Sequence, residues 1–270
     1  MNSLLLVLAL LYAVLAVCVW RFWRRYAAEH YPLRTELMAL VPILLLHTSV
    51  VWLPVLHERT LAIGFGDALT VVAWLMVLLY WCGSFFYPLK GLQLLLYPCA
   101  ALSMLLAAVW PGQHMGYSVH NLPFMLHISA ALLAYGLFGI TTLLAVLMLV
   151  LNRQLHRRKM SAMMVSLPPL LSIEKLMFQG LWAGFVLLTV AVVSGTFFAE
   201  AVFGQPAAFT HKTVFGVISW LIYAVILFKH HTQAWRGKKA AQWMLVAFAC
   251  LMLAYIGSKF VLEIVLQRMV

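Results

Sequence analysis

Residues 122–151 read LPFMLHISAALLAYGLFGITTLLAVLMLVL, an apolar run without a charged side chain. A helix needs about 20 apolar residues to cross the hydrocarbon core of a bilayer, so this run can span a membrane with some tilt. A cluster of cations follows it at Arg153, Arg157, Arg158 and Lys159. The stretch therefore predicts a transmembrane helix that ends in a basic loop.

More apolar runs lie on both sides of this segment. We expect spans at residues 3–20, 37–56, 67–87, 91–110, 122–151, 173–199, 211–231 and 241–266. Hydrophobic residues make up 65% of the chain and charged residues 9%, whereas soluble domains carry about 25% charged residues. No polar segment is long enough to form a separate unit. The sequence therefore predicts an all-α, polytopic membrane helix bundle with about eight transmembrane helices, in one domain that covers residues 1–270.

The cations lie mainly in alternate connections. They follow the first, third, fifth and seventh spans, at Arg21, Arg24, Arg25, Arg34, Lys90, Arg153, Arg157, Arg158, Lys159, Lys229, Arg236, Lys238 and Lys239. Because basic loops of membrane proteins stay in the cytoplasm, this pattern predicts both termini outside, on the periplasmic side of a bacterial inner membrane. Topology thus accounts for the formal net charge of +11. We expect the lipid bilayer as a partner, and no nucleic acid.

Two histidines, His127 and His211, are expected at similar depth near the outer end of the bundle. His127 lies one turn inside the fifth span, and His211 opens the seventh. Neutral imidazole is a good iron ligand, and two facing histidines can hold a haem axially. The cysteines form no CxxCH motif, so covalent haem attachment is not expected. The hypothesis is a non-covalent haem b with both histidines as iron ligands.

The neighbours of these histidines suit a flat, anionic macrocycle. Small residues share the helical face of His127, at Ala130, Ala131 and Ala134, and the Lys212 side chain could meet a propionate. A second interpretation stays open, in which a boundary histidine only forms hydrogen bonds and an alanine stripe only packs. Spacing alone does not choose between the two.

Two further ionisable groups lie inside predicted spans, where they cost free energy unless they are paired or used. His47 sits near the middle of the second span. A second ligand site, a proton path and a structural hydrogen bond are all open roles for it. Lys259 shares a face of the last span with Tyr255 and Glu263. It could contact an anionic ligand, pair with Glu263 or reach out to the interface.

The segment LHISAALLAY at 126–135 resembles the fifth-helix motif of the cytochrome c assembly family, which includes the CcsA, HemX and YpjD types. Further matches cover the second half of the chain and look closest to the YpjD type. They are PPLLSIEK at 168–175, HKT at 211–213, SWLIY at 219–223, WRG at 235–237 and AYIGSK at 254–259. The resemblance implies an eight-span inner-membrane protein related to haem-handling proteins.

The resemblance also has gaps. In the family's assembly proteins, haem is presented at the outer face between histidines that flank a Trp-rich loop, and it is delivered to apocytochrome c. His127 fits the first of these histidines by motif. Residues 202–210 contain no tryptophan, and Leu266-Gln267 stands where the late histidine is expected. We therefore expect an accessory haem-binding protein in cytochrome c or haem metabolism rather than a synthase or another enzyme.

In that interpretation His211 substitutes for the missing late histidine, and His47 is an inner ligand or a proton-linked group. Lys212 and Lys259 would then meet the propionates. Apocytochrome c or another membrane protein would be the partner.

Two other functions stay open. A non-catalytic regulatory or assembly partner of another membrane protein would keep the fold without haem, which the missing loop and histidine favour. A transporter of small molecules or ions would need a continuous polar path. The spans carry few charges, and no inverted repeat is visible in the sequence.

Overall fold

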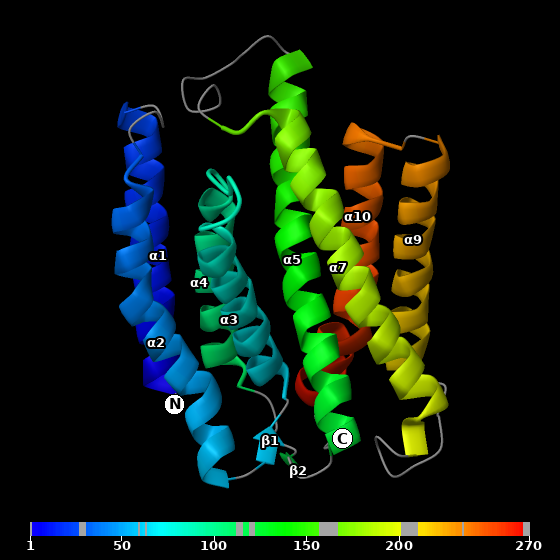
Figure 1. Cartoon of the computed structure of the whole chain (residues 1–270). Coiled ribbons are helices and arrows are strands. Elements are labelled where there is room, and N and C mark those ends of the chain that lie inside the picture. Colours follow the sequence, from blue (N-terminus) through cyan, green and yellow to red (C-terminus); the bar gives the residue numbers. More distant parts are fainter. Residues whose placement is uncertain are drawn as a thin grey trace.

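The computed structural model describes residues 2–26, 31–58, 60–62, 64–111, 116–118, 122–156, 167–200, 210–233 and 235–266. Over these residues the chain is a bundle of long helices (Figure 1). The helices are α1 (Asn2–Tyr26), α2 (Leu33–Glu58), α3 (Phe65–Gly83), α4 (Gln93–Val109), α5 (Leu122–His156), α7 (Leu170–Phe197), α9 (His211–Gln233) and α10 (Gly237–Met252). The last helix continues in π-helical register as η2 (Leu253–Gly257) and η3 (Phe260–Val265).

The predicted polytopic helix bundle is confirmed. Among the described residues, 7 helices are long and apolar enough to cross a membrane. The remaining one, α4, is a shorter apolar helix of 17 residues. The turn between α3 and α4 is tight because Gly91 adopts a φ of 94°, a conformation that glycine reaches at little steric cost.

The two ends of the chain lie at the same end of the bundle (Figure 1). At the opposite end lie all the described lysines and arginines except Lys212 and Lys259. By the charge rule used for the sequence, the basic end is expected to face the cytoplasm and both termini to lie outside. We call the end that carries both chain termini the outer end.

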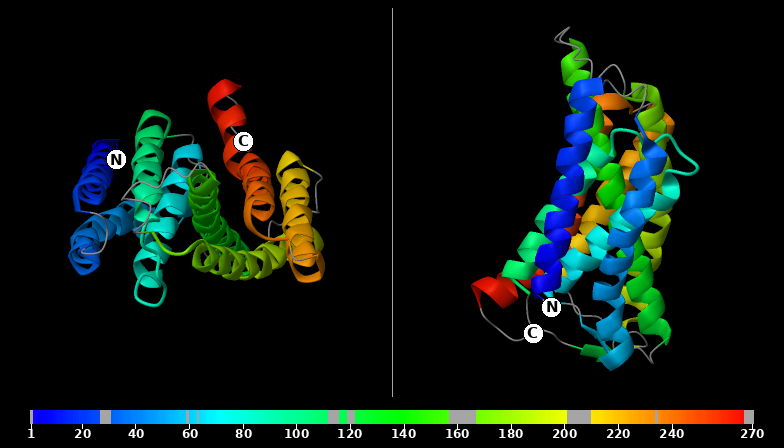
Figure 2. Two further views of the ribbon diagram at one scale, coloured as in Figure 1. Left: turned by 90° about the horizontal axis from the view of Figure 1, so that it is seen from above. Right: turned by 90° about the vertical axis from the view of Figure 1, so that its left-hand side faces the viewer.

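The helices form two neighbouring groups (Figure 2). The first group contains α1, α2, α3 and α4, and α1 packs against α4 along much of its length. The second group contains α5, α7, α9 and α10. Helix α5 joins the groups, since it packs against α7 on one side and α3 on the other.

Glycines let α5 approach both of its neighbours closely. A Cβ atom added at Gly139 of α5 would lie 2.6 Å from the Met76 sulfur of α3. On the other side, a Cβ at Gly184 of α7 would lie 2.9 Å from the Phe138 ring of α5. In a bilayer, where lipid is as apolar as the side chains, this close packing is a main source of helix association.

A small β-sheet at the outer end was not expected from the sequence. Strand β1 (Thr60–Ala62) follows α2, and strand β2 (Gly116–Ser118) precedes α5. They pair antiparallel, with Thr60 opposite Ser118 and Ala62 opposite Gly116. The two connections satisfy part of each other's backbone hydrogen bonding outside the helices.

A buried carboxylate binds the first group together near its cytoplasmic end. Glu36 of α2 is 7% exposed and accepts hydrogen bonds from three phenol hydroxyls. Tyr31 donates to Oε2 at 2.5 Å and Tyr80 of α3 donates to Oε1 at 3.0 Å. Tyr97 of α4 also donates to Oε1. These bonds offset the cost of burying the carboxylate and tie three elements to one side chain.

Candidate functional site

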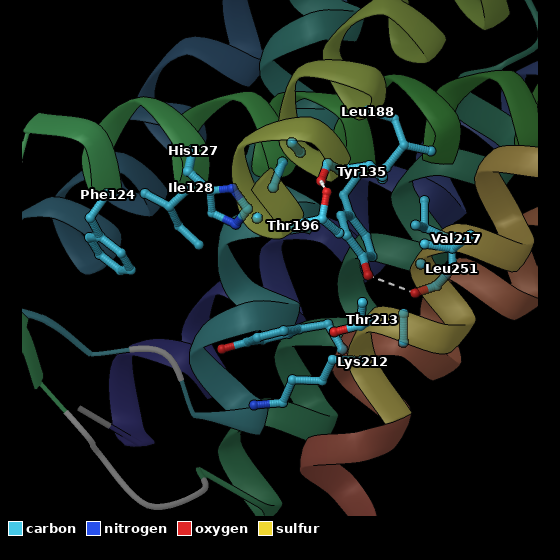
Figure 3. Close-up of a pocket in the computed structure, with 17 residues that line it drawn as sticks. Phe124, His127, Ile128, Tyr135, Leu188, Thr196, Lys212, Thr213, Val217 and Leu251 are labelled. Atoms are coloured by element: carbon cyan, nitrogen blue, oxygen red, sulfur yellow. Dashed lines mark hydrogen bonds between the residues drawn. The ribbon is translucent and has the colours of Figure 1, made fainter. Parts of the chain in front are cut away.

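A cavity of about 250 Å³ opens in the second helix group near the outer end (Figure 3). Four segments line it: positions 124–135 of α5, 188–196 of α7, 212–217 of α9 and 251–255 at the junction of α10 and η2. Most of the lining side chains are apolar. The exceptions include one imidazole, one ammonium group and several hydroxyls.

His127 stands in the α5 wall of this cavity, half-buried (Figure 3). Its Nδ1 lies 2.8 Å from the Oγ of Ser194 on α7. Of the three alanines predicted to flank a macrocycle, only Ala131 lines the cavity. Ala130 and Ala134 are buried in the helix packing, so the packing interpretation holds for these two.

Lys212 provides the cationic group of the cavity (Figure 3). Its Nζ lies 5.6 Å from the centroid of the Tyr255 ring, a cation–π contact between α9 and η2. The structure therefore brings the predicted residues His127 and Lys212 into one cavity, with an imidazole on one wall and an ammonium group on another.

His211 is not among the residues that line the cavity, and its side chain is exposed. Neighbouring residues on an α-helix point about 100° apart, so Lys212 faces the cavity while His211 faces away. In the described structure the predicted pair of facing histidines is thus not brought together.

His47 lies in the other helix group, fully buried, on the side of α2 that faces α1 and α3. Its Nε2 is 3.1 Å from the backbone oxygen of Thr70, and its Nδ1 is 2.9 Å from the hydroxyl of Tyr12. Because a carbonyl oxygen only accepts, Nε2 donates and Nδ1 accepts from the tyrosine. Both ring nitrogens are used inside the protein, which favours the structural hydrogen bond among the three open roles.

Lys259 is buried as well, and it does not line the cavity. Its Nζ lies 3.0 Å from Oε1 of Glu263, so the pairing considered from the sequence is present. The second carboxylate oxygen of Glu263 accepts the backbone N–H of Phe65 at 3.0 Å, at the positive end of α3. Glu263 therefore joins the last helix to the first helix group. Because Lys259 is paired with it away from the cavity, Lys212 is the cation on the cavity wall.

Two polar residues of this region, Tyr135 and Ser194, make contacts that were not predicted from the sequence. Tyr135 donates a hydrogen bond of 2.6 Å to the backbone oxygen of Leu251, which ties α5 to α10 across the cavity (Figure 3). Ser194 is the other, as the partner of His127. A run of small and polar residues, Ser194-Gly195-Thr196, near the end of an apolar helix was the available signal for it.

Fold and site together define a class: a polytopic helical membrane protein with an apolar cavity that carries one histidine and one lysine. Residues 37–266 match the family model described as cytochrome C assembly protein. The chain therefore belongs to the cytochrome c assembly protein family, as its motifs predicted, and it is a multi-pass protein of the bacterial inner membrane.

Curated relatives agree with this assignment. The chain is 29% identical to the inner membrane protein YpjD of Escherichia coli K12 over 171 residues, which are 63% of this chain and 64% of that protein. It is 25% identical to the cytochrome c biogenesis protein CcsA of Chlamydomonas reinhardtii over 206 residues, 73% of this chain and 57% of that protein. The chain thus spans less than two thirds of the length of these relatives. No solved structure matches the chain.

Proposed function

We propose that this protein binds haem b non-covalently in the cavity at the outer end and acts as an accessory protein in cytochrome c assembly or haem metabolism. The observation that carries the proposal is the position of the His127 imidazole in the wall of an apolar cavity that also contains Lys212. Family membership supports it, because relatives named CcsA are cytochrome c biogenesis proteins.

The side chains of the cavity fit the chemistry of haem. An imidazole nitrogen is a common axial ligand of haem iron, and the ammonium group of Lys212 can pair with a propionate. The apolar walls suit the face of a macrocycle and exclude water from it. When bound, haem supplies the iron centre, while the protein supplies one ligand, one counter-charge and the apolar surface.

The size of the cavity limits how haem is held. Pockets that enclose most of a ligand are about 300–1,000 Å³. At about 250 Å³ this cavity lies below that range, so an edge of the macrocycle would remain outside it. Partial enclosure near the outer face suits a protein that passes haem on, and apocytochrome c or another membrane protein would be the recipient.

Haem titration of the protein purified in mild detergent tests the proposal. The wild-type protein is expected to develop a Soret band at stoichiometric haemin, and the variant His127→Ala to lose it. His211→Ala is the matched control, because its side chain is exposed and does not line the cavity. A wild-type protein whose spectrum with haemin stays that of free haemin in the same detergent would refute haem binding.

A second candidate is a regulatory or assembly partner that keeps the fold without haem. The small cavity favours it, as does Leu266 where the late histidine of the family is expected; the loop at 201–209 lies outside the described residues. A transporter is less well supported. Among the described residues, the buried acids and Lys259 are engaged in hydrogen bonds or an ion pair, so they form no evident path for a solute.

A further inference from the structure

Two consecutive residues of α7, Ser194 and Gly195, form the seat of the His127 imidazole. The Ser194 hydroxyl lies 2.8 Å from the ring Nδ1. A Cβ atom added at Gly195 would lie 3.0 Å from the ring Cε1 and 3.7 Å from Nδ1. The imidazole therefore packs directly on the backbone of α7, at a place where an added Cβ atom would press on the ring.

The hydrogen bonds of the Ser194 hydroxyl indicate which nitrogen of His127 carries hydrogen. The Ser194 oxygen is 2.7 Å from the backbone oxygen of Val190 and 3.2 Å from that of Ala191. Carbonyl oxygens only accept, and a serine hydroxyl has one proton to give. Ser194 therefore donates to its own helix and accepts from His127. The backbone oxygen of Ala191 is a further hydrogen-bond partner of His127, and it also only accepts. It lies 3.2 Å from the Ser194 oxygen, on the Nδ1 side of the ring, so both contacts place the hydrogen on Nδ1 and the lone pair on Nε2.

We propose that Ser194 and Gly195 are positioning residues that hold His127 in one place and in the Nδ1–H tautomer. The cavity then offers an imidazole whose Nε2 can coordinate an electron-poor centre such as haem iron. This inference rests on the proposed function, and it adds how the ligand is prepared. It follows the general pattern in which a metal-binding histidine donates its other nitrogen to a fixed acceptor.

The histidine of the first helix group shows the opposite arrangement. His47 donates from Nε2 to the Thr70 backbone oxygen, and its Nδ1 accepts from Tyr12. The two histidines are therefore expected to hold opposite tautomers in the same protein. This difference gives the test an internal reference, since His47 should not respond to a change at Ser194.

The first measurement is made without haem. The protein is labelled with ¹⁵N-histidine, and the ring nitrogen shifts of His127 are identified as those lost in His127→Ala. We expect the Nδ1–H form in the wild-type protein and a gain of the Nε2–H form in Ser194→Ala. Ser194→Thr keeps a hydroxyl and should restore the wild-type tautomer. Ser219→Ala is the matched control, since the Ser219 hydroxyl likewise donates to the backbone of its own helix, at Gly216.

The second measurement is haem affinity of the same variants. Removal of an outer-shell partner typically weakens metal binding by about 10–100-fold, so we expect that loss in Ser194→Ala. Ser194→Thr and Ser219→Ala should stay near the wild-type affinity. Gly195→Ala should also bind haem more weakly, because its new methyl group displaces the ring.

The two measurements separate this inference from the proposed function. The role of Ser194 is overturned if His127 of the wild-type protein is in the Nε2–H form. It is also overturned if Ser194→Ala leaves the tautomer of His127 unchanged. If His127 shows the Nδ1–H form, loses it in Ser194→Ala, and the protein takes up no haem, the positioning role of Ser194 is supported. Haem binding as the reason for that positioning is then overturned. Normal haem affinity in Ser194→Ala, despite a changed tautomer, overturns the link between the seat and the ligand.

Discussion

The two helix groups use buried polar side chains in opposite ways. In the first group, His47 and Glu36 are buried, and their hydrogen-bonding atoms are engaged by neighbouring segments of the protein. In the second group, His127 and Lys212 stand in the wall of a cavity. The difference teaches that the surroundings of a membrane histidine decide whether a ligand can reach it. Depth in the membrane, which made His47 conspicuous in the sequence, is not the deciding property.

The largest effect is expected from Glu36→Leu, which removes the acceptor of three buried hydroxyls. A buried donor left without a partner costs about 1–3 kcal/mol, so the variant should lose roughly 3–5 kcal/mol of stability. Thermal unfolding in detergent, followed by circular dichroism, measures the loss. Glu36→Gln keeps one acceptor oxygen, so its stability should lie between that of Glu36→Leu and that of the wild type. Equal stability of Glu36→Leu and wild type would mean that the cluster does not hold the first group together.

The next effect compares the two histidines directly. His47→Leu leaves the buried Tyr12 hydroxyl without its partner and removes a second hydrogen bond to the Thr70 carbonyl, so it should cost about 1–3 kcal/mol of stability. Haem uptake by the folded fraction should not change. His127→Ala should show the reverse, with lost haem uptake and a stability change below about 1 kcal/mol. If His47→Leu removed the Soret band and left stability intact, the assignment of roles to the two groups would be wrong.

A smaller effect is expected at the cationic wall of the cavity. Lys212→Gln should weaken haem binding by about 2–5-fold, because a partly exposed ion pair contributes up to about 1 kcal/mol. The difference from wild type should shrink as salt is added, since salt screens such pairs. Lys175→Gln, at the cytoplasmic end of α7, provides a control with the same change of charge. Wild-type affinity in Lys212→Gln at low salt would exclude a propionate contact.

The smallest effect at neutral pH concerns Tyr31, in the connection between α1 and α2. Burial raises the pKa of its hydroxyl, and the nearby Glu36 carboxylate raises this pKa further. The unfolded chain releases this proton near pH 10, whereas the folded protein retains it. Stability should therefore be unaffected below about pH 10 and should fall as the pH rises above that value. Tyr31→Phe should flatten this alkaline decline, and an unchanged pH profile in the variant would mean that the decline arises from another group.

Hydropathy and charge were sufficient to predict the bundle, since lipid solvation acts on each span separately and leaves a local pattern. The pairing of Lys259 with Glu263 was also accessible, because one helical turn separates the two residues. The hydrogen-bonded cluster around Glu36 could not be predicted from the sequence, since its partners come from segments up to 61 residues away. The same holds for Ser194, which lies 67 residues from His127. The position of His211 outside the cavity lining could not be predicted either, because the rotation of α9, which brings Lys212 to the cavity, depends on packing against neighbours.

The short β1–β2 pair has a consequence for how the chain can assemble. It joins the connection after α2 to the connection before α5, and α3 and α4 lie between them in the chain. The paired strands thus close a loop around one helical hairpin. The pair thereby holds the two ends of that hairpin side by side, so α3 and α4 enter and leave the bundle at a single place.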